Sequence, residues 1–224
     1  MRWYLSAKAR LGVALIIASL SSVALFFVGA IRTHETIYAY LVWNLFLAWI
    51  PFALTLWLVK ILRKQLWSSW QAIVMTIAWL FFLPNSFYLI SDLTHLEDMP
   101  HVYQLYDAMM FASFVMNGVI LGFISVYLVH NELLKRLSKR FSTILVTVTL
   151  LLCSYAVYLG HSLRWNTWDV LLNPAGVLVG VSDPILHPRA DSSALITAIT
   201  FFVLLSTTYA IIWQLVRVVR MQKA

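Results

Sequence analysis

Four polar side chains, Asn85, Tyr88, Asp92 and His95, follow one another where a strongly apolar stretch of the sequence ends. Their spacing places them on one face if the segment is a continuous α-helix. Asp92 and His95 suit either two metal ligands or a carboxylate that orients an imidazole for proton transfer. The simpler alternative is a surface hydrogen bond where a helix end reaches water. Asp92 and His95 are therefore the catalytic candidates, and Asn85 and Tyr88 are candidates for substrate binding.

A second polar group contains Arg164, Trp165, Asn166, Trp168 and Asp169. These residues follow the fifth apolar run, where the chain is expected to leave the membrane, and tryptophans there are typical of the membrane interface. The arginine predicts either a salt bridge to Asp92, Asp107 or Asp169, or a clamp for a ligand carboxylate or phosphate. We therefore add this group to the substrate-binding candidates. Asp107, which is expected to face the same outer vestibule as Asp92, joins the catalytic candidates.

Three asparagines within apolar sequence have a structural interpretation as well. Asn85 follows Pro84, whose ring removes a backbone N–H, so the Asn85 amide is able to bond the carbonyl left free. Asn44 and Asn117 are expected to act as polar links between helices, bonding one another or Asn85. These alternatives remain open at the level of the sequence.

The elements that position these residues are membrane helices. The chain has 224 residues, of which 62% are hydrophobic and 11% charged, with a mean hydropathy of +0.83. Soluble domains are about a quarter charged, so the composition indicates an integral membrane protein. A single cysteine, Cys153, excludes an intramolecular disulfide and is expected to be buried.

The sequence predicts an all-α, six-helix membrane bundle that forms one domain over residues 1–224. Apolar runs long enough to cross a bilayer occur at 11–31, 37–59, 70–90, 108–129, 144–160 and 194–216. Pro84 is expected to kink the third span. Residues 161–193 form an outer loop, expected to act as a lid. Within it, 170–181 is apolar but too short to cross, so we expect a re-entrant or interfacial segment with an irregular backbone.

The distribution of charge predicts the orientation of the bundle. Thirteen of the sixteen basic residues lie on the side of the two termini, in the segments 2–10, 60–64, 135–140 and 217–223. Eight of the nine acidic residues lie on the opposite side. The positive-inside rule then makes both termini cytoplasmic, in a plasma membrane, with the candidate site facing away from the cytoplasm. The net charge of +7 is explained by topology, which argues against nucleic acid as a partner.

Three stretches resemble a bacterial membrane family catalogued as domain of unknown function 1361. They are NLFLAWIP at 44–51, the Leu83-Pro84-Asn85 motif with the polar residues up to Leu96, and RWNTWD at 164–169. The resemblance covers the chain from about the second span to the sixth. It implies a multi-pass bacterial membrane protein, and it implies no particular activity.

Three functions agree with these patterns. The first is a membrane enzyme that acts outside the cytoplasm on a lipid-linked or cell-envelope substrate. The second is a non-catalytic accessory subunit that docks a membrane or envelope protein, and the third is a small-solute carrier. The sequence identifies no cofactor, and it contains no phosphate-binding loop, zinc-protease motif, nucleophile elbow or dinucleotide fingerprint. The bilayer itself is the one partner that the composition specifies.

Overall fold

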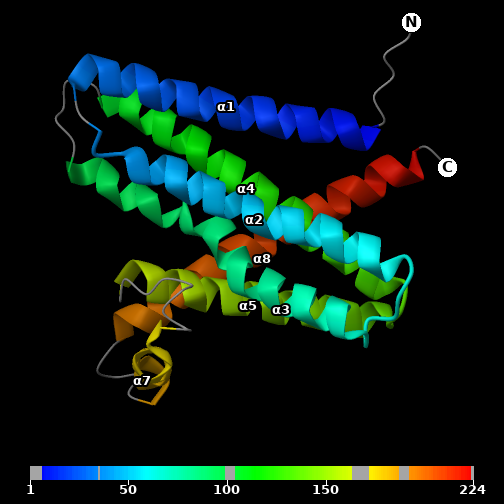
Figure 1. Ribbon diagram of the computed structural model, residues 1–224. Helices are drawn as coiled ribbons and strands as arrows, with labels where there is room; N and C mark the ends of the chain where they lie inside the picture. Colours follow the sequence, from blue (N-terminus) through cyan, green and yellow to red (C-terminus); the bar gives the residue numbers. More distant parts are fainter. Residues whose placement is uncertain (1–6, 35, 99–103, 163–171, 187–191, 223–224) are drawn as a thin grey trace, which may run out of the picture.

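The computed structural model of the protein describes residues 7–34, 36–98, 104–162, 172–186 and 192–222, and these residues are almost entirely helical (Figure 1). The α-helices are α1 (Ala7–Thr33), α2 (Ala39–Leu62), α3 (Trp70–Tyr88), α4 (Gln104–Leu134), α5 (Lys139–Ser162), α7 (Pro174–Leu186) and α8 (Ser192–Met221). A 3-10 helix, η1 (Ser91–Asp98), follows α3. No strand occurs in the described part of the chain, so the predicted all-α class is confirmed.

Six of these helices, α1 to α5 and α8, are long and apolar enough to cross a membrane. Each coincides with a predicted span, and the ends differ by no more than five residues, as in α4, Gln104–Leu134, against the predicted 108–129. Where a helix extends past the apolar run, as α4 and α5 do, backbone hydrogen bonding continues into polar sequence. Helix α1 begins and α8 ends at the same end of the bundle (Figure 1).

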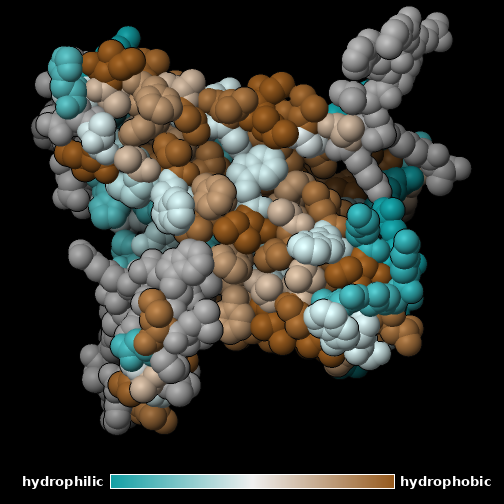
Figure 2. Space-filling model, in the orientation of Figure 1, coloured by the Kyte–Doolittle hydropathy of each residue, from teal (hydrophilic) through white to brown (hydrophobic). Residues whose placement is uncertain are grey.

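The charged residues at the two ends of the bundle differ in sign. The basic end comprises Lys60, Arg63, Lys64, Lys135, Arg136, Lys139, Arg140, Arg217 and Arg220, at the termini of α2, α4, α5 and α8. The acidic end carries Asp92 in η1 and Asp107 in the first turn of α4, together with one arginine, Arg32, in the last turn of α1. Figure 2 shows apolar residues over the middle of the bundle and hydrophilic ones over the turn between α2 and α3. This distribution matches a protein that crosses an apolar layer.

The helices pack around α3 and α4. Helix α2 contacts both, α1 lies against α4, and α5 lies between α3 and α8. One apolar core joins α1, α2 and α4 through side chains such as Phe111 and Phe114. A second joins α3, α5 and α8 to the other ends of α2 and α4, through residues such as Phe87 and Leu150. Cys153 is buried in the second core, as the sequence predicted.

Two glycines one turn apart allow α3 and α4 to approach closely. A Cβ atom added at Gly118 would lie 2.4 Å from Leu89 Cδ1 and 2.7 Å from the Ser86 carbonyl oxygen. A Cβ atom at Gly122 would lie 2.8 Å from the Phe87 ring. Small residues four apart are a common device for close helix packing in membranes. This contact places the end of α3, and therefore the start of η1, directly on α4.

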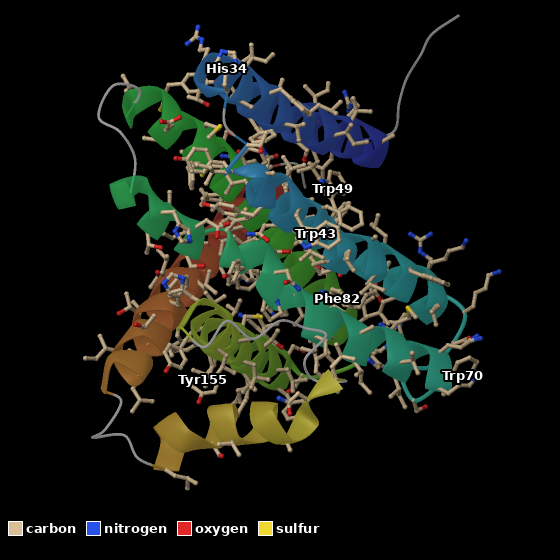
Figure 3. All side chains as sticks on the ribbon, turned by 60° about the vertical axis from the view of Figure 1, so that its left-hand side comes forward. His34, Trp43, Trp49, Trp70, Phe82 and Tyr155 are labelled. Carbon is tan, nitrogen blue, oxygen red and sulfur yellow. The ribbon has the colours of Figure 1, made fainter. Side chains whose placement is uncertain are left out.

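Helix α7 occupies the apolar part of the segment predicted not to cross the membrane. It has 13 residues and spans about 20 Å, which is too short for a roughly 30 Å hydrocarbon core. The expected irregular backbone was wrong, because Asn173 and Pro174 start a helix. The Asn173 side chain accepts a hydrogen bond from the Gly176 N–H at 3.1 Å, and proline suits the first helical position. The Tyr155 hydroxyl of α5 donates to the Val181 carbonyl at 2.6 Å, which joins α7 to the bundle (Figure 3).

The close contact of α4 with α3 can be tested by adding a methyl group. We expect Gly118→Ala to lower the free energy of unfolding by about 1–3 kcal/mol, because the backbone at Ser86 cannot move aside cheaply. Thermal or denaturant unfolding of the detergent-solubilised protein measures the change.

Gly12→Ala is the matched control, because a Cβ atom there has nothing within 4 Å. Alanine favours a helix over glycine, so the control should be unchanged or slightly more stable. Equal stability of the two variants would contradict the close packing of α3 on α4.

Candidate functional site

Asn85, Tyr88, Asp92 and His95 do not lie on one continuous α-helix, which corrects the expectation from their spacing. Helix α3 ends at Tyr88, and the chain changes direction before η1 begins at Ser91 (Figure 1). The Ser91 hydroxyl donates to the Tyr88 carbonyl at 2.6 Å, and the Thr94 hydroxyl donates to the Ser91 carbonyl at 2.8 Å. Hydroxyl bonds to carbonyls three residues earlier compete with the α-helical pattern. They account for the tighter helix that carries Asp92 and His95.

The change of helix type brings Asp92 and His95 together on the side of η1 that faces α2. Side chains three apart eclipse each other in a 3-10 helix. The Asn44 side-chain amide of α2 donates to Asp92 Oδ2 at 2.9 Å. One turn earlier on α2, the Tyr40 ring meets the His95 ring edge to face, with centroids 5.7 Å apart. We call Tyr40, Asn44, Asp92 and His95 the α2–η1 cluster.

Asp92 and His95 differ in their access to solvent. Asp92 is buried, with 3% of its surface exposed, whereas His95 is exposed. Within the described residues, no lysine or arginine forms an ion pair with Asp92. Its carboxyl is therefore held by a neutral amide beside an imidazole that solvent or a ligand reaches. That combination suits proton exchange between a substrate and the imidazole, with the buried carboxyl beside it to orient the ring.

Asp107 lies at the same end of the bundle, in the first turn of α4, and it is also buried. Helix α4 packs against η1. The structure thus places the three catalytic candidates, Asp92, His95 and Asp107, on two elements in contact. In the described part of the chain, no three histidine, cysteine, aspartate or glutamate side chains are grouped closely enough to hold a metal ion. A metal on Asp92 and His95 therefore requires a ligand from elsewhere.

Asn85 and Tyr88 lie on α3, before the chain turns into η1. The Asn85 amide donates to the Phe82 carbonyl at 3.0 Å, within the same helix. The expected acceptor was the Leu80 carbonyl, which Pro84 deprives of its usual N–H donor. The Asn85 side chain thus bonds a backbone carbonyl of its own helix, two residues nearer than the carbonyl that was predicted. Tyr88 is the last residue of α3, and its carbonyl accepts the Ser91 hydroxyl.

The second predicted group lies outside the described residues. It comprises Arg164, Trp165, Asn166, Trp168 and Asp169, all in the segment 163–171. Their predicted roles as a salt bridge, an anion clamp or an interfacial belt remain predictions.

Asn117 links helices, as predicted, although its partners differ from those expected. Its amide nitrogen lies 2.8 Å from the Ser22 hydroxyl and 3.2 Å from the Ala18 carbonyl, both on α1. Asn44 instead bonds Asp92. Spacing alone does not predict the pairing of Asn44 with Asp92. The signal that the sequence does offer is the separation of Tyr40 and Asn44 by four residues, which places both on one face of α2.

Comparison with known proteins gives a family and no activity. The profile of a family described as a protein of unknown function (DUF1361) matches residues 43–207, which is well over half of the chain. The chain belongs to this family. The resemblance expected from the three sequence stretches is thereby confirmed. No curated protein and no solved structure matches the chain. The family match includes Asn44, Asp92, His95 and Asp107, and it begins three residues after Tyr40.

The hydrogen bond between α2 and η1 can be tested by removing its donor. We expect Asn44→Ala to lower the free energy of unfolding by about 1–3 kcal/mol, because the buried Asp92 carboxyl then loses its amide partner. Denaturant unfolding in detergent measures the loss.

Asn131→Ala is the matched control, because among the described residues the Asn131 amide bonds only the Tyr127 carbonyl of its own helix. Its effect should stay within about 0.5 kcal/mol. An Asn44→Ala variant as stable as this control would contradict the role of Asn44.

Proposed function

We propose that this protein is a membrane enzyme whose acid–base site is the α2–η1 cluster. The observation that carries the proposal is the pairing of a buried carboxyl, Asp92, with an exposed imidazole, His95, on one side of a 3-10 helix. A carboxyl that served packing alone would be replaced at little cost by a neutral group.

The roles of the two residues follow from their exposure. His95 is the group that a substrate reaches, so it gives or accepts the proton. Asp92, which solvent does not reach, would orient the imidazole and is itself fixed by the Asn44 amide. Asp107 supplies a second carboxyl from α4. Asn85, Tyr88 and the group at 164–169 are the proposed substrate contacts, and Arg164 would bind an anionic part of the substrate.

The substrate class follows from where the cluster lies. It sits at the acidic end of helices that cross the membrane, opposite the basic end. The positive-inside rule makes the basic end cytoplasmic, so the cluster faces the outside of a plasma membrane. A substrate that reaches this position from within the bilayer or along its surface is a lipid-linked or cell-envelope molecule.

A non-catalytic accessory subunit is the second candidate. The hydrogen bond between Asn44 and Asp92 favours this candidate, because a carboxyl that already has a partner can also serve to hold α2 and η1 together. The acidic end would then dock a membrane or envelope protein. A solute carrier has less support, since Asn117 is bonded to α1 and is followed towards the basic end by buried apolar side chains such as Leu121.

The two candidates differ in what conservative substitutions do. Asp92→Asn keeps an acceptor for the Asn44 amide, and His95→Gln keeps a polar side chain of similar size. We expect both variants to fold as the wild type does and to lower the catalysed rate by at least about 100-fold, because each removes proton transfer. The measurement compares lipids and envelope components, by mass spectrometry, in membranes that contain the wild type or a variant.

Asn131→Ala, which leaves the acidic end intact, serves as the active control. The enzyme predicts molecules that change with the wild type and with this control but not with Asp92→Asn or His95→Gln. Identical profiles for all four proteins would overturn the enzymatic proposal and favour the accessory subunit.

A further inference from the structure

A cavity of about 300 Å³ lies at the basic end, on the opposite side of the bundle from the α2–η1 cluster. Its apolar wall is formed by Tyr127, Leu134, Trp213 and Val216. It is also lined by three cationic side chains, Lys139 at the start of α5 and Arg217 and Arg220 at the end of α8. The cavity thus combines an apolar wall with positive charge from two helices.

The three cations have no acidic partners within the described residues. The one acidic side chain of the basic end, Glu132, is taken by Lys135 and Arg136 of its own helix. Lys139, Arg217 and Arg220 are exposed and form no ion pair with any described carboxylate. An arginine supplies donors whose geometry matches phosphate, so this unpaired charge fits an anion that the protein itself does not provide.

The aromatic wall of the cavity is fixed by contacts with the core. The Trp213 ring stacks on His130 at 4.2 Å, and His130 Nδ1 lies 2.8 Å from the Tyr209 hydroxyl. Tyr127 packs on Trp213 at 5.6 Å, and the Arg220 guanidinium lies 5.6 Å from the Tyr127 ring centroid. The Tyr127 hydroxyl is buried and has no hydrogen-bond partner among the described residues. The cavity is therefore preformed by packing and retains an unused polar group in its wall.

We propose that this cavity binds the headgroup of an anionic phospholipid. Its phosphate would lie among Lys139, Arg217 and Arg220, and the adjoining glycerol and upper acyl region would lie against Trp213 and Val216. Basic pockets between membrane helices bind such headgroups. The acyl chains would continue along α8 towards the middle of the bundle, where Leu215 and Ile211 are exposed. A free phosphate ion would satisfy the cations and leave the apolar wall unused.

The test measures lipid binding to the purified full-length protein in a neutral detergent. Native mass spectrometry and thermal unfolding are followed with added phosphatidylglycerol, phosphatidylcholine or inorganic phosphate. We expect a retained phosphatidylglycerol molecule and a raised melting temperature, with little effect of the other two. The triple variant Lys139→Gln, Arg217→Gln, Arg220→Gln should bind on the order of a hundredfold more weakly, since each cation near an anionic headgroup contributes about fivefold.

The matched control removes three charges from the same end but away from the cavity, as Lys60→Gln, Arg63→Gln, Lys64→Gln. This control should bind phosphatidylglycerol like the wild type. If the cavity triple fails to fold, Arg217→Gln alone should weaken binding about fivefold. Equal loss in both triples, equal binding of phosphatidylcholine, or binding of inorganic phosphate as tight as that of the lipid would overturn the proposal.

Discussion

The hydrocarbon core of a membrane offers no water to polar groups, so each one inside the bundle has to bond with protein. Ser125 of α4 shows how this constraint orders the structure. Its hydroxyl contacts the Thr55 hydroxyl of α2 at 2.6 Å, accepts the Trp79 indole N–H of α3 at 2.7 Å and donates to the Pro51 carbonyl at 3.2 Å. One side chain thereby fixes α2, α3 and α4 relative to one another.

Helix α1 is attached to this centre in the same way. Trp49 of α2, which lies between α1 and α2 in Figure 3, donates its indole N–H to the Ser19 hydroxyl at 3.1 Å. Asn117 makes the corresponding link between α4 and α1. With the relative positions of the helices fixed inside the bundle, the ends of the helices are fixed too. Tyr40 and Asn44 meet η1 because these bonds hold α2 in one position against α1 and α4.

The parts of the structure that the sequence predicted are those that depend on composition along one segment. The six spans follow from the length of apolar runs, and the different charge of the two ends follows from where basic residues interrupt them. The prediction of a single polar face was wrong, because the end of α3 depends on hydroxyl bonds from Ser91 and Thr94. The periodicity of the sequence does not indicate such bonds. The hydrogen-bond partners of Asn44 and Asn117 were predicted wrongly for a related reason. Spacing indicates the face of a helix on which a side chain lies, but not the neighbouring helix that this face contacts. The irregular backbone expected within 170–181 was wrong because the Asn173-Pro174 pair has the chemistry of a helix start.

The central claim is that a hydrogen bond between α2 and η1 holds a buried carboxyl in place beside His95. A double-mutant cycle with Asn44→Ala, Asp92→Ala and the double variant tests it most directly, because the cycle isolates the energy of the pair. The account predicts an interaction free energy of about 1–3 kcal/mol from unfolding of the four proteins. Additive effects, within about 0.3–0.5 kcal/mol, would show that the two side chains do not act together and would contradict the account.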